Sequence, residues 1–75
     1  MNIEELLHKG YVERSMMKTP IGGEYSEAHF FDENWNYTTK NLAEHMVVKE
    51  FDSNGNVINE ISMDRKSNDS SKKNR

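Results

Sequence analysis

The segment Phe51-Asp52-Ser53-Asn54-Gly55-Asn56-Val57-Ile58 decides the fold, because its pattern also occurs twenty residues earlier, in Phe31-Asp32-Glu33-Asn34-Trp35-Asn36-Tyr37-Thr38. Both segments read Phe-Asp-x-Asn-x-Asn and continue into strand-forming residues. Asp and Asn side chains satisfy the amide groups of turns, and Asn-Gly supplies the positive φ that tight hairpin turns require. The sequence therefore predicts two β-hairpins of a meander. Trp35, which stands in the first copy where the second has glycine, predicts a wider or bulged first turn.

The strand pairing of the second hairpin has two solutions. A two-residue turn at Asn54-Gly55 gives three cross-strand pairs, which are Val48 with Ile61, Met46 with Met63, and Lys49 with Glu60. A three-residue turn ending at Gly55 instead gives Phe51 with Val57 and Val47 with Ile61. Both solutions place apolar residues on one face, and a slip of one residue exchanges the two faces of a strand. Both registers therefore stay open.

Residues 2–10 carry the start and stop signals of a short helix. Asn2 and Glu5 have the spacing of a capping box, in which each side chain accepts a hydrogen bond from the other residue's backbone amide. Gly10 suits the left-handed conformation that ends a helix. Because two helical turns are not stable alone, the apolar face of this helix is expected to dock on the rest of the domain. That face consists of Ile3, Leu6 and Leu7.

Residues 11–18 and 24–31 are expected to be strands separated by a chain reversal. The reversal is predicted at residues 19–23, Thr-Pro-Ile-Gly-Gly, because Pro fixes one dihedral angle and Gly permits positive φ. Residues 24–31 alternate, with Ser26, Ala28 and Phe30 on one face and Tyr25, Glu27, His29 and Phe31 on the other. Residues 39–44 are either one helical turn capped by Thr39 or a loop.

The size and composition of the chain allow a single small domain. It has 75 residues, of which 33% are hydrophobic and 31% charged, and no cysteine. A domain of this size buries only about 60% of the surface of its unfolded chain, so it depends on a thin core or on a partner chain. Residues 1–64 are expected to form one α+β domain, in which the helix packs on an antiparallel β-meander of about five strands. Residues 65–75 are predicted to be a disordered basic polar tail.

The charges are divided unevenly between the domain and the tail. Residues 1–64 hold twelve acidic and five basic side chains, a net charge of −7, whereas residues 65–75 hold five basic and one acidic. A negative domain repels phosphates, which disfavours direct nucleic-acid binding. The acidic N-terminus is not followed by the apolar run of a signal peptide, and no window reaches the ~20 apolar residues of a membrane span. Without cysteine as well, a cytoplasmic protein with no membrane contact is expected.

Metal, cofactor and catalytic sites are not expected. The two Asp-x-Asn-x-Asn runs resemble the opening of a calcium loop, but an EF-hand needs Gly at its sixth position and Glu at its twelfth. Those positions hold Tyr37 and Ala43 in the first run, and Val57 and Met63 in the second. The histidines, His8, His29 and His45, form no short-spaced pair, and no cysteine completes a zinc set. No nucleophile–base pair or phosphate loop is evident, so the chain is predicted not to be an enzyme and to use no cofactor or small-molecule substrate.

The remaining functional signal is aromatic. Trp35 falls in a predicted turn, where an exposed aromatic side chain is a candidate interface anchor; the alternative is that it folds back to cover the sheet. Trp35, Tyr37 and His29 are the predicted partner-binding residues. We expect a small non-catalytic protein-interaction module that completes its core by self-association, as a homodimer, or by binding a protein partner. The alternative, motivated by the acidic domain, is an acidic inhibitor or nucleic-acid mimic of mobile-element type that blocks a DNA- or RNA-binding enzyme.

Overall fold

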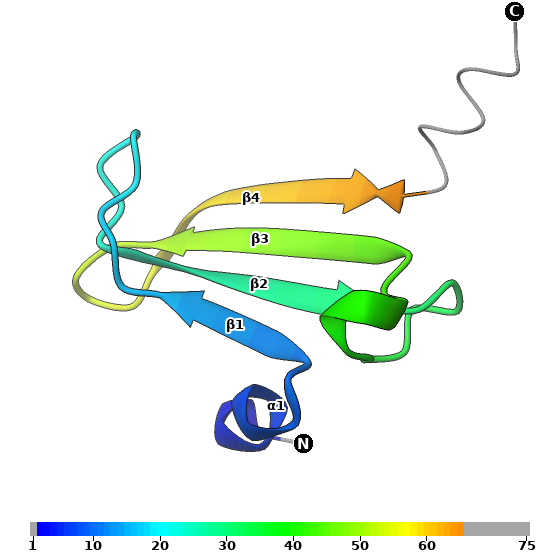
Figure 1. Cartoon of the computed structure of the whole chain (residues 1–75). Helices are drawn as coiled ribbons and strands as arrows, with labels where there is room; N and C mark the ends of the chain where they lie inside the picture. The colour runs from blue at the N-terminus through cyan, green and yellow to red at the C-terminus, as the bar shows by residue number, and fades with distance from the viewer. Residues whose placement is uncertain (1, 66–75) are drawn as a thin grey trace, which may run out of the picture.

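Four antiparallel strands lie side by side in chain order, β1-β2-β3-β4, and one short helix precedes them (Figure 1). The computed structural model describes residues 2–65. Its elements are α1 (Ile3–Lys9), β1 (Val12–Ser15), β2 (Tyr25–Phe31), the 3-10 turn η1 (Lys40–Leu42), β3 (His45–Phe51) and β4 (Val57–Asp64). The predicted α+β class, with an N-terminal helix and an antiparallel meander, is confirmed. Of the predicted tail, only Arg65 lies within the described residues.

The helix α1 has both of its predicted end signals. The Asn2 side chain accepts a hydrogen bond from the Glu5 amide at 2.9 Å, and the Glu5 carboxylate accepts one from the Asn2 amide at 3.4 Å. Gly10 has a φ of 81° and ends the helix, and the Tyr11 amide donates to the Leu6 carbonyl at 2.9 Å. The helix lies beside β1, the first edge of the sheet, and Leu6 is buried (Figure 1). The expected docking of this helix is therefore observed.

The connection between β1 and β2 is the predicted chain reversal. The Thr19 amide donates to the Gly23 carbonyl at 2.8 Å, and the Gly23 amide donates to the Thr19 hydroxyl, also at 2.8 Å. A Cβ added at Gly23 would lie 2.6 Å from that hydroxyl oxygen, so this close approach requires glycine. The first strand ends at Ser15 rather than at residue 18, because the chain turns away from β2 there.

The two Asp/Asn corners have the same hydrogen-bond geometry. In each, an Asp carboxylate oxygen accepts from the backbone amides two and four residues later, and the Asp amide donates to the carbonyl of the second Asn. The residue between the two Asn has positive φ, 65° at Trp35 and 85° at Gly55. The first turn is therefore no wider than the second. Its hydrogen bonds hold a tryptophan in the left-handed conformation, which costs a non-glycine residue about 1–2 kcal/mol.

The Asp52 carboxylate is expected to make the second corner sensitive to acid. Its hydrogen bonds from the Asn56 and Asn54 amides lower its pKa from the usual value of 3.8. A carboxyl group with a lowered pKa stabilises the fold above its unfolded-state pKa, and this contribution is lost as the pH falls through the folded-state pKa. Asp52→Asn is therefore expected to lower the free energy of unfolding at neutral pH and to lose this effect in strong acid.

Urea unfolding of the wild type and of Asp52→Asn, from neutral pH down through the folded-state pKa of Asp52, measures the change in the free energy of unfolding. An NMR titration assigns this change to the Asp52 carboxyl group. A native Asp52 that titrates at the same pH as in the unfolded chain would contradict the expectation.

The fifth expected strand is reduced to a single bridge between Phe31 and Tyr37. From there the chain crosses over β2 instead of running back along it, and the Glu44 amide donates to the Phe31 carbonyl at 2.8 Å where β3 begins. The crossing segment, residues 38–44, contains η1 (Figure 1). Of the two alternatives for this segment, the helical turn forms, but the Thr39 side chain does not cap it. The sheet consequently has four strands rather than about five.

The cross-strand register assigns side chains to two faces of the sheet. Residues paired across antiparallel strands share a face, and Val12, His29 and Val47 are aligned in this way. The His29 face also contains Arg14, Tyr25, Glu27, Phe31, His45, Lys49, Phe51, Glu60, Ser62 and Asp64. The Phe30 face contains Glu13, Ala28, Phe30, Met46, Val48, Glu50, Asn59, Ile61 and Met63. The alternation predicted for residues 24–31 is confirmed.

The pairing of β3 with β4 combines the two predicted registers. Beside the turn, Phe51 pairs with Val57, as a three-residue turn requires. Farther along, Val48 pairs with Ile61, as a two-residue turn requires. A register shift at Glu50/Phe51 joins the two, because a β-bulge places one extra residue in β4.

The hydrophobic core is small because the sheet is a single layer with one short helix and one crossing segment against it. The buried hydrophobic residues of the described chain are Leu6, Val12, Phe30 and Ala43. Three charged or polar residues are buried with them, namely Glu27, His29 and Glu50. Phe30, at 2% exposure, is one of the two most buried large side chains. So few buried apolar groups give limited stability to a domain of this size.

Candidate interaction surface

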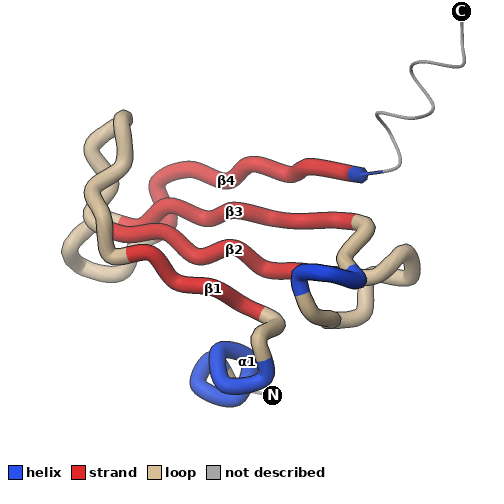
Figure 2. Tube along the Cα trace, in the orientation of Figure 1, coloured by secondary structure: helices blue, strands red, loops and turns tan. Residues whose placement is uncertain are grey.

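The strand β4 is an edge of the sheet and has no strand on its outer side among residues 2–65. All four of its apolar side chains are exposed, Val57 by 52%, Ile58 and Ile61 by 43% and Met63 by 46%. The opposite edge, β1, is only four residues long and has α1 beside it (Figure 2). An edge strand presents unpaired N–H and C=O groups on which another strand can pair. β4 is therefore the edge of this sheet that is open to strand addition.

An apolar strip on the Phe30 face continues inward from β4. Ile61 lies opposite Val48, and Met63 lies opposite Met46. Val48 lies in turn opposite Ala28 on β2. The side chains of the strip on β3 are half-buried, whereas those on β4 are exposed. The apolar surface thus becomes more open toward the unpaired edge.

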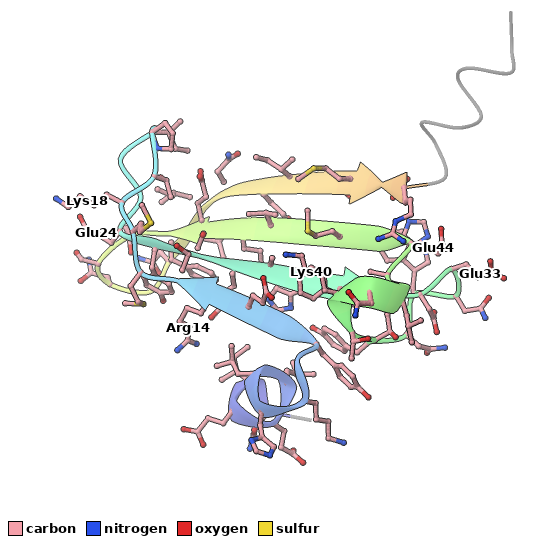
Figure 3. All side chains as sticks on the ribbon, viewed as in Figure 1. Arg14, Lys18, Glu24, Glu33, Lys40 and Glu44 are labelled. Carbon is pink, nitrogen blue, oxygen red and sulfur yellow. The ribbon has the colours of Figure 1, made fainter. Side chains whose placement is uncertain are left out.

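A cavity of about 320 Å³ lies where the crossing segment meets the ends of β3 and β4. Phe30, Ala43, Met46 and Met63 form its apolar lining, and Lys40, Glu44, His45, Asp64 and Arg65 form its polar lining. Figure 3 shows Lys40 and Glu44 on the crossing segment. The Glu44 Oε1 atom is buried and makes no hydrogen bond. The cavity therefore combines apolar walls with charged groups at the end of the sheet.

On the His29 face, a series of polar contacts joins β1 and β2 to Tyr37, which follows the first Asp/Asn corner. The Arg14 guanidinium donates to one Glu27 carboxylate oxygen from Nη2 at 2.8 Å and from Nε at 3.1 Å. The His29 ring lies between Glu27, with Nε2 3.3 Å from Oε1, and Tyr37, with Nδ1 2.9 Å from the hydroxyl oxygen. Burial raises the pKa of the Tyr37 hydroxyl, and the negative charge of Glu27 raises it further. These contacts hold separate parts of the chain together.

The Trp35 ring folds back on the sheet. It stacks on His45 with the ring centroids 3.9 Å apart and the planes 5° from parallel, and it lies 5.5 Å from the Phe31 ring. The His45 Nδ1 atom in turn contacts Asp64 Oδ1 on β4. Trp35 is nevertheless 51% exposed. Of the two alternatives for this residue, the ring covers part of the sheet while about half of its surface still faces solvent.

The three predicted partner-binding residues lie near one another, but they differ in exposure. Tyr37 is half-buried and hydrogen-bonds to His29, which is itself buried. The Tyr37 ring lies against Phe31, with centroids 4.6 Å apart. Only Trp35 of the three predicted residues is largely open to solvent. A partner contact for each of these residues stays a prediction.

The exposed side chains of β4 were not singled out from the sequence. Ile61 and Met63 alternate with the polar Glu60 and Ser62, and this alternation predicts one apolar face. Alternation does not encode which strand lies at an edge of the sheet, or which edge lies against the helix. The open apolar edge therefore appears only with the strand order.

No family model, curated protein or solved structure matches the chain. Within the described residues, neither α1 nor η1 has the length and hydropathy needed to cross a membrane. The described residues also include no group of three or more His, Asp or Glu side chains placed to hold a metal ion.

Proposed function

We propose that the protein is a small non-catalytic interaction module that completes its thin core by adding a strand to β4, either from a second copy or from another protein. The observation that carries the proposal is the exposure of all four apolar side chains of an unpaired edge strand. Strand addition satisfies the main-chain groups of the edge, and the alternate side chains give specificity. It also removes apolar surface from water, which contributes about 25 cal/mol per Å².

The small core supports the same proposal. Only four hydrophobic residues of the described chain are buried. Domains of this size commonly need a disulfide, a metal or a partner to add stability, and the chain has no cysteine. A partner strand beside Ile61 and Met63 would extend the apolar strip on the Phe30 face.

The contacts of the two sheet histidines support a structural role for them. His29 lies between Glu27 and Tyr37, and His45 lies between Trp35 and Asp64. Each histidine thus connects different segments of the sheet. The non-catalytic part of the proposal rests on this use of the histidines, and a cytoplasmic location stays a prediction.

No specific observation favours the acidic-inhibitor alternative. Three acidic side chains lie near bases, namely Glu27 at 2.8 Å from Arg14, Glu13 at 3.8 Å from Lys40 and Glu24 at 3.9 Å from Lys18. Figure 3 shows Lys18 and Glu24 together at the connection between β1 and β2. Such pairing reduces the negative field that a mimic of nucleic-acid phosphates must present. The acidic side chains therefore support the interaction module better than the inhibitor.

Ile61→Lys is expected to weaken association about tenfold or more, because it places a charge in the centre of the open edge. Met17→Lys is the matched control, because Met17 is 76% exposed and lies outside the sheet. Sedimentation velocity at micromolar concentration measures self-association, and purification with each variant as bait measures binding of another protein.

The proposal requires that the wild type and Met17→Lys associate alike and that Ile61→Lys associates more weakly. A wild type that stays monomeric and recovers no partner would overturn it, as would Ile61→Lys binding that equals the wild type. Circular dichroism checks that both variants are folded.

A further inference from the structure

We propose that the strand added to β4 is β4 of a second copy, antiparallel and centred on Ile61, so that the two sheets join into one of eight strands. This inference rests on the proposed function and names its partner. It follows from which edge is open, from which main-chain groups point outward, and from the charges along β4.

The shape of the sheet leaves β4 as the edge for pairing. β1 is short and has α1 beside it, whereas β4 spans eight residues, Val57–Asp64. Figure 2 shows the outer side of the C-terminal half of β4 clear of other described segments. Two copies joined edge to edge by a two-fold axis use the same surface on each, which is the commonest form of homodimer.

The outward main-chain groups belong to alternate residues of β4. The Arg65 amide donates to the Glu44 carbonyl at 2.8 Å, on the inner side next to β3. Because successive residues of a strand direct their N–H and C=O groups to opposite sides, those of Glu60, Ser62 and Asp64 point outward. A second strand must therefore form its hydrogen bonds with these three residues.

Of the two-fold axes at residues 60, 61 and 62, near the middle of β4, the charges favour one. In a continuous antiparallel sheet, residues that lie opposite each other share a face, so the two-fold axis must pass beside a residue. An axis at Glu60 sets two glutamates opposite each other, and an axis at Ser62 sets Glu60 opposite Asp64 of the second copy. Like charges placed directly opposite destabilise a sheet. An axis at Ile61 avoids both conflicts.

Next to the two-fold axis, the register centred on Ile61 also places polar opposite polar and apolar opposite apolar residues. Glu60 of each copy lies opposite Ser62 of the other, and both have outward main-chain groups. Ile61 lies opposite Ile61 as a non-hydrogen-bonded pair, in which the Cα atoms are ~4.5 Å apart and the side chains are closest. Because Ile61 is on the Phe30 face with Val48, the apolar strips of the two copies meet at the axis.

Cysteine cross-linking tests this register, because the chain has no cysteine of its own and every disulfide formed is between copies. Ile61→Cys is expected to form a disulfide dimer under mild oxidation, since opposed Cα atoms ~4.5 Å apart lie within the range that a disulfide spans. Ser62→Cys and Glu60→Cys alone are expected to cross-link at least about tenfold more slowly, because each residue faces the other and not itself. An equimolar mixture of these two variants is expected to cross-link as a mixed dimer.

Sedimentation of the wild type separates failure of this inference from failure of the proposed function. If the wild type self-associates but the Ser62→Cys or the Glu60→Cys variant cross-links faster than the Ile61→Cys variant, the register is overturned. A wild type that is monomeric, yet binds another protein through an edge that Ile61→Lys disrupts, overturns the second copy as partner and leaves the interaction module standing. A monomer whose binding Ile61→Lys leaves unchanged overturns both.

Discussion

Phe30→Ala is expected to leave the protein largely unfolded at room temperature. Phe30 is 2% exposed, lies opposite Met46 on β3, and lines the cavity at the crossing segment together with Ala43. Truncating a buried Phe to Ala costs about 3–5 kcal/mol, because transfer free energy is lost and a cavity remains. A core of this size rarely supplies more than about 3–5 kcal/mol in total. The expected loss is therefore comparable to the stability of the whole domain.

Far-ultraviolet circular dichroism and urea unfolding measure this effect. Met17→Ala is the matched control, because Met17 is 76% exposed and a surface change of this kind alters stability by about 0.5 kcal/mol or less. A Phe30→Ala protein that unfolds in the same cooperative transition as the control would show that Phe30 is not the centre of the core.

Arg14→Met is expected to lower the free energy of unfolding by about 2 kcal/mol, because it removes the ion-pair partner of a buried carboxylate. The Glu27 side chain is 8% exposed and accepts two hydrogen bonds from Arg14, and its other oxygen lies 3.3 Å from His29. The Arg14 side chain is 37% exposed, so solvent screens part of the pair. The expected loss in the free energy of unfolding is therefore smaller than the loss for a fully buried ion pair.

A double-mutant cycle distinguishes the charge from the packing of Arg14. Glu27→Gln removes the charge while keeping an oxygen and a nitrogen at the end of the side chain. The double variant Arg14→Met with Glu27→Gln is expected to be more stable than Arg14→Met alone, because no buried charge is left without its partner. Urea unfolding measures the free energy of unfolding of each variant. If the losses of the two single variants add up to the loss of the double variant, Arg14 and Glu27 are not coupled as an ion pair.

The hairpins show how far the sequence determines the fold. The repeated Asp/Asn pattern correctly predicts both corners, because the Asp carboxylates and the turn amides lie close together along the chain. The local sequence does not decide how β3 pairs with β4, because the β-bulge beside Phe51 lets both predicted pairings occur in one hairpin. A bulge depends on packing across the whole sheet, and turn residues alone do not reveal it.

The first hairpin shows a different limit. Trp35 takes the conformation expected of glycine, and its stacking on His45 and the hydrogen bonds of Asp32 favour that geometry. His45 lies ten residues away in the chain, so the local sequence does not show this contact. For the same reason the crossing of residues 38–44 over β2, which reduces the expected fifth strand to one bridge, becomes visible only in three dimensions.

The candidate surface was predictable only in part. Tyr37 lies against His29 and Phe31, whereas Trp35 lies against Phe31 and His45. The unequal exposure of Trp35, Tyr37 and His29 depends on which side chains pack over them, and the sequence does not predict that packing. The apolar alternation at Ile61 and Met63 was visible, but its position at an open edge follows from the order of the four strands.

The unlike edges of the sheet set a limit on the size of any assembly formed through β4. A sheet with two open edges can add copies without end, as in a fibril. Here one edge is a four-residue strand with α1 packed beside it. Once β4 is joined to a second copy, residues 2–65 of each molecule offer no further long edge strand. Growth through β4 is therefore expected to stop at a closed pair, because α1 lies beside the opposite edge of each sheet.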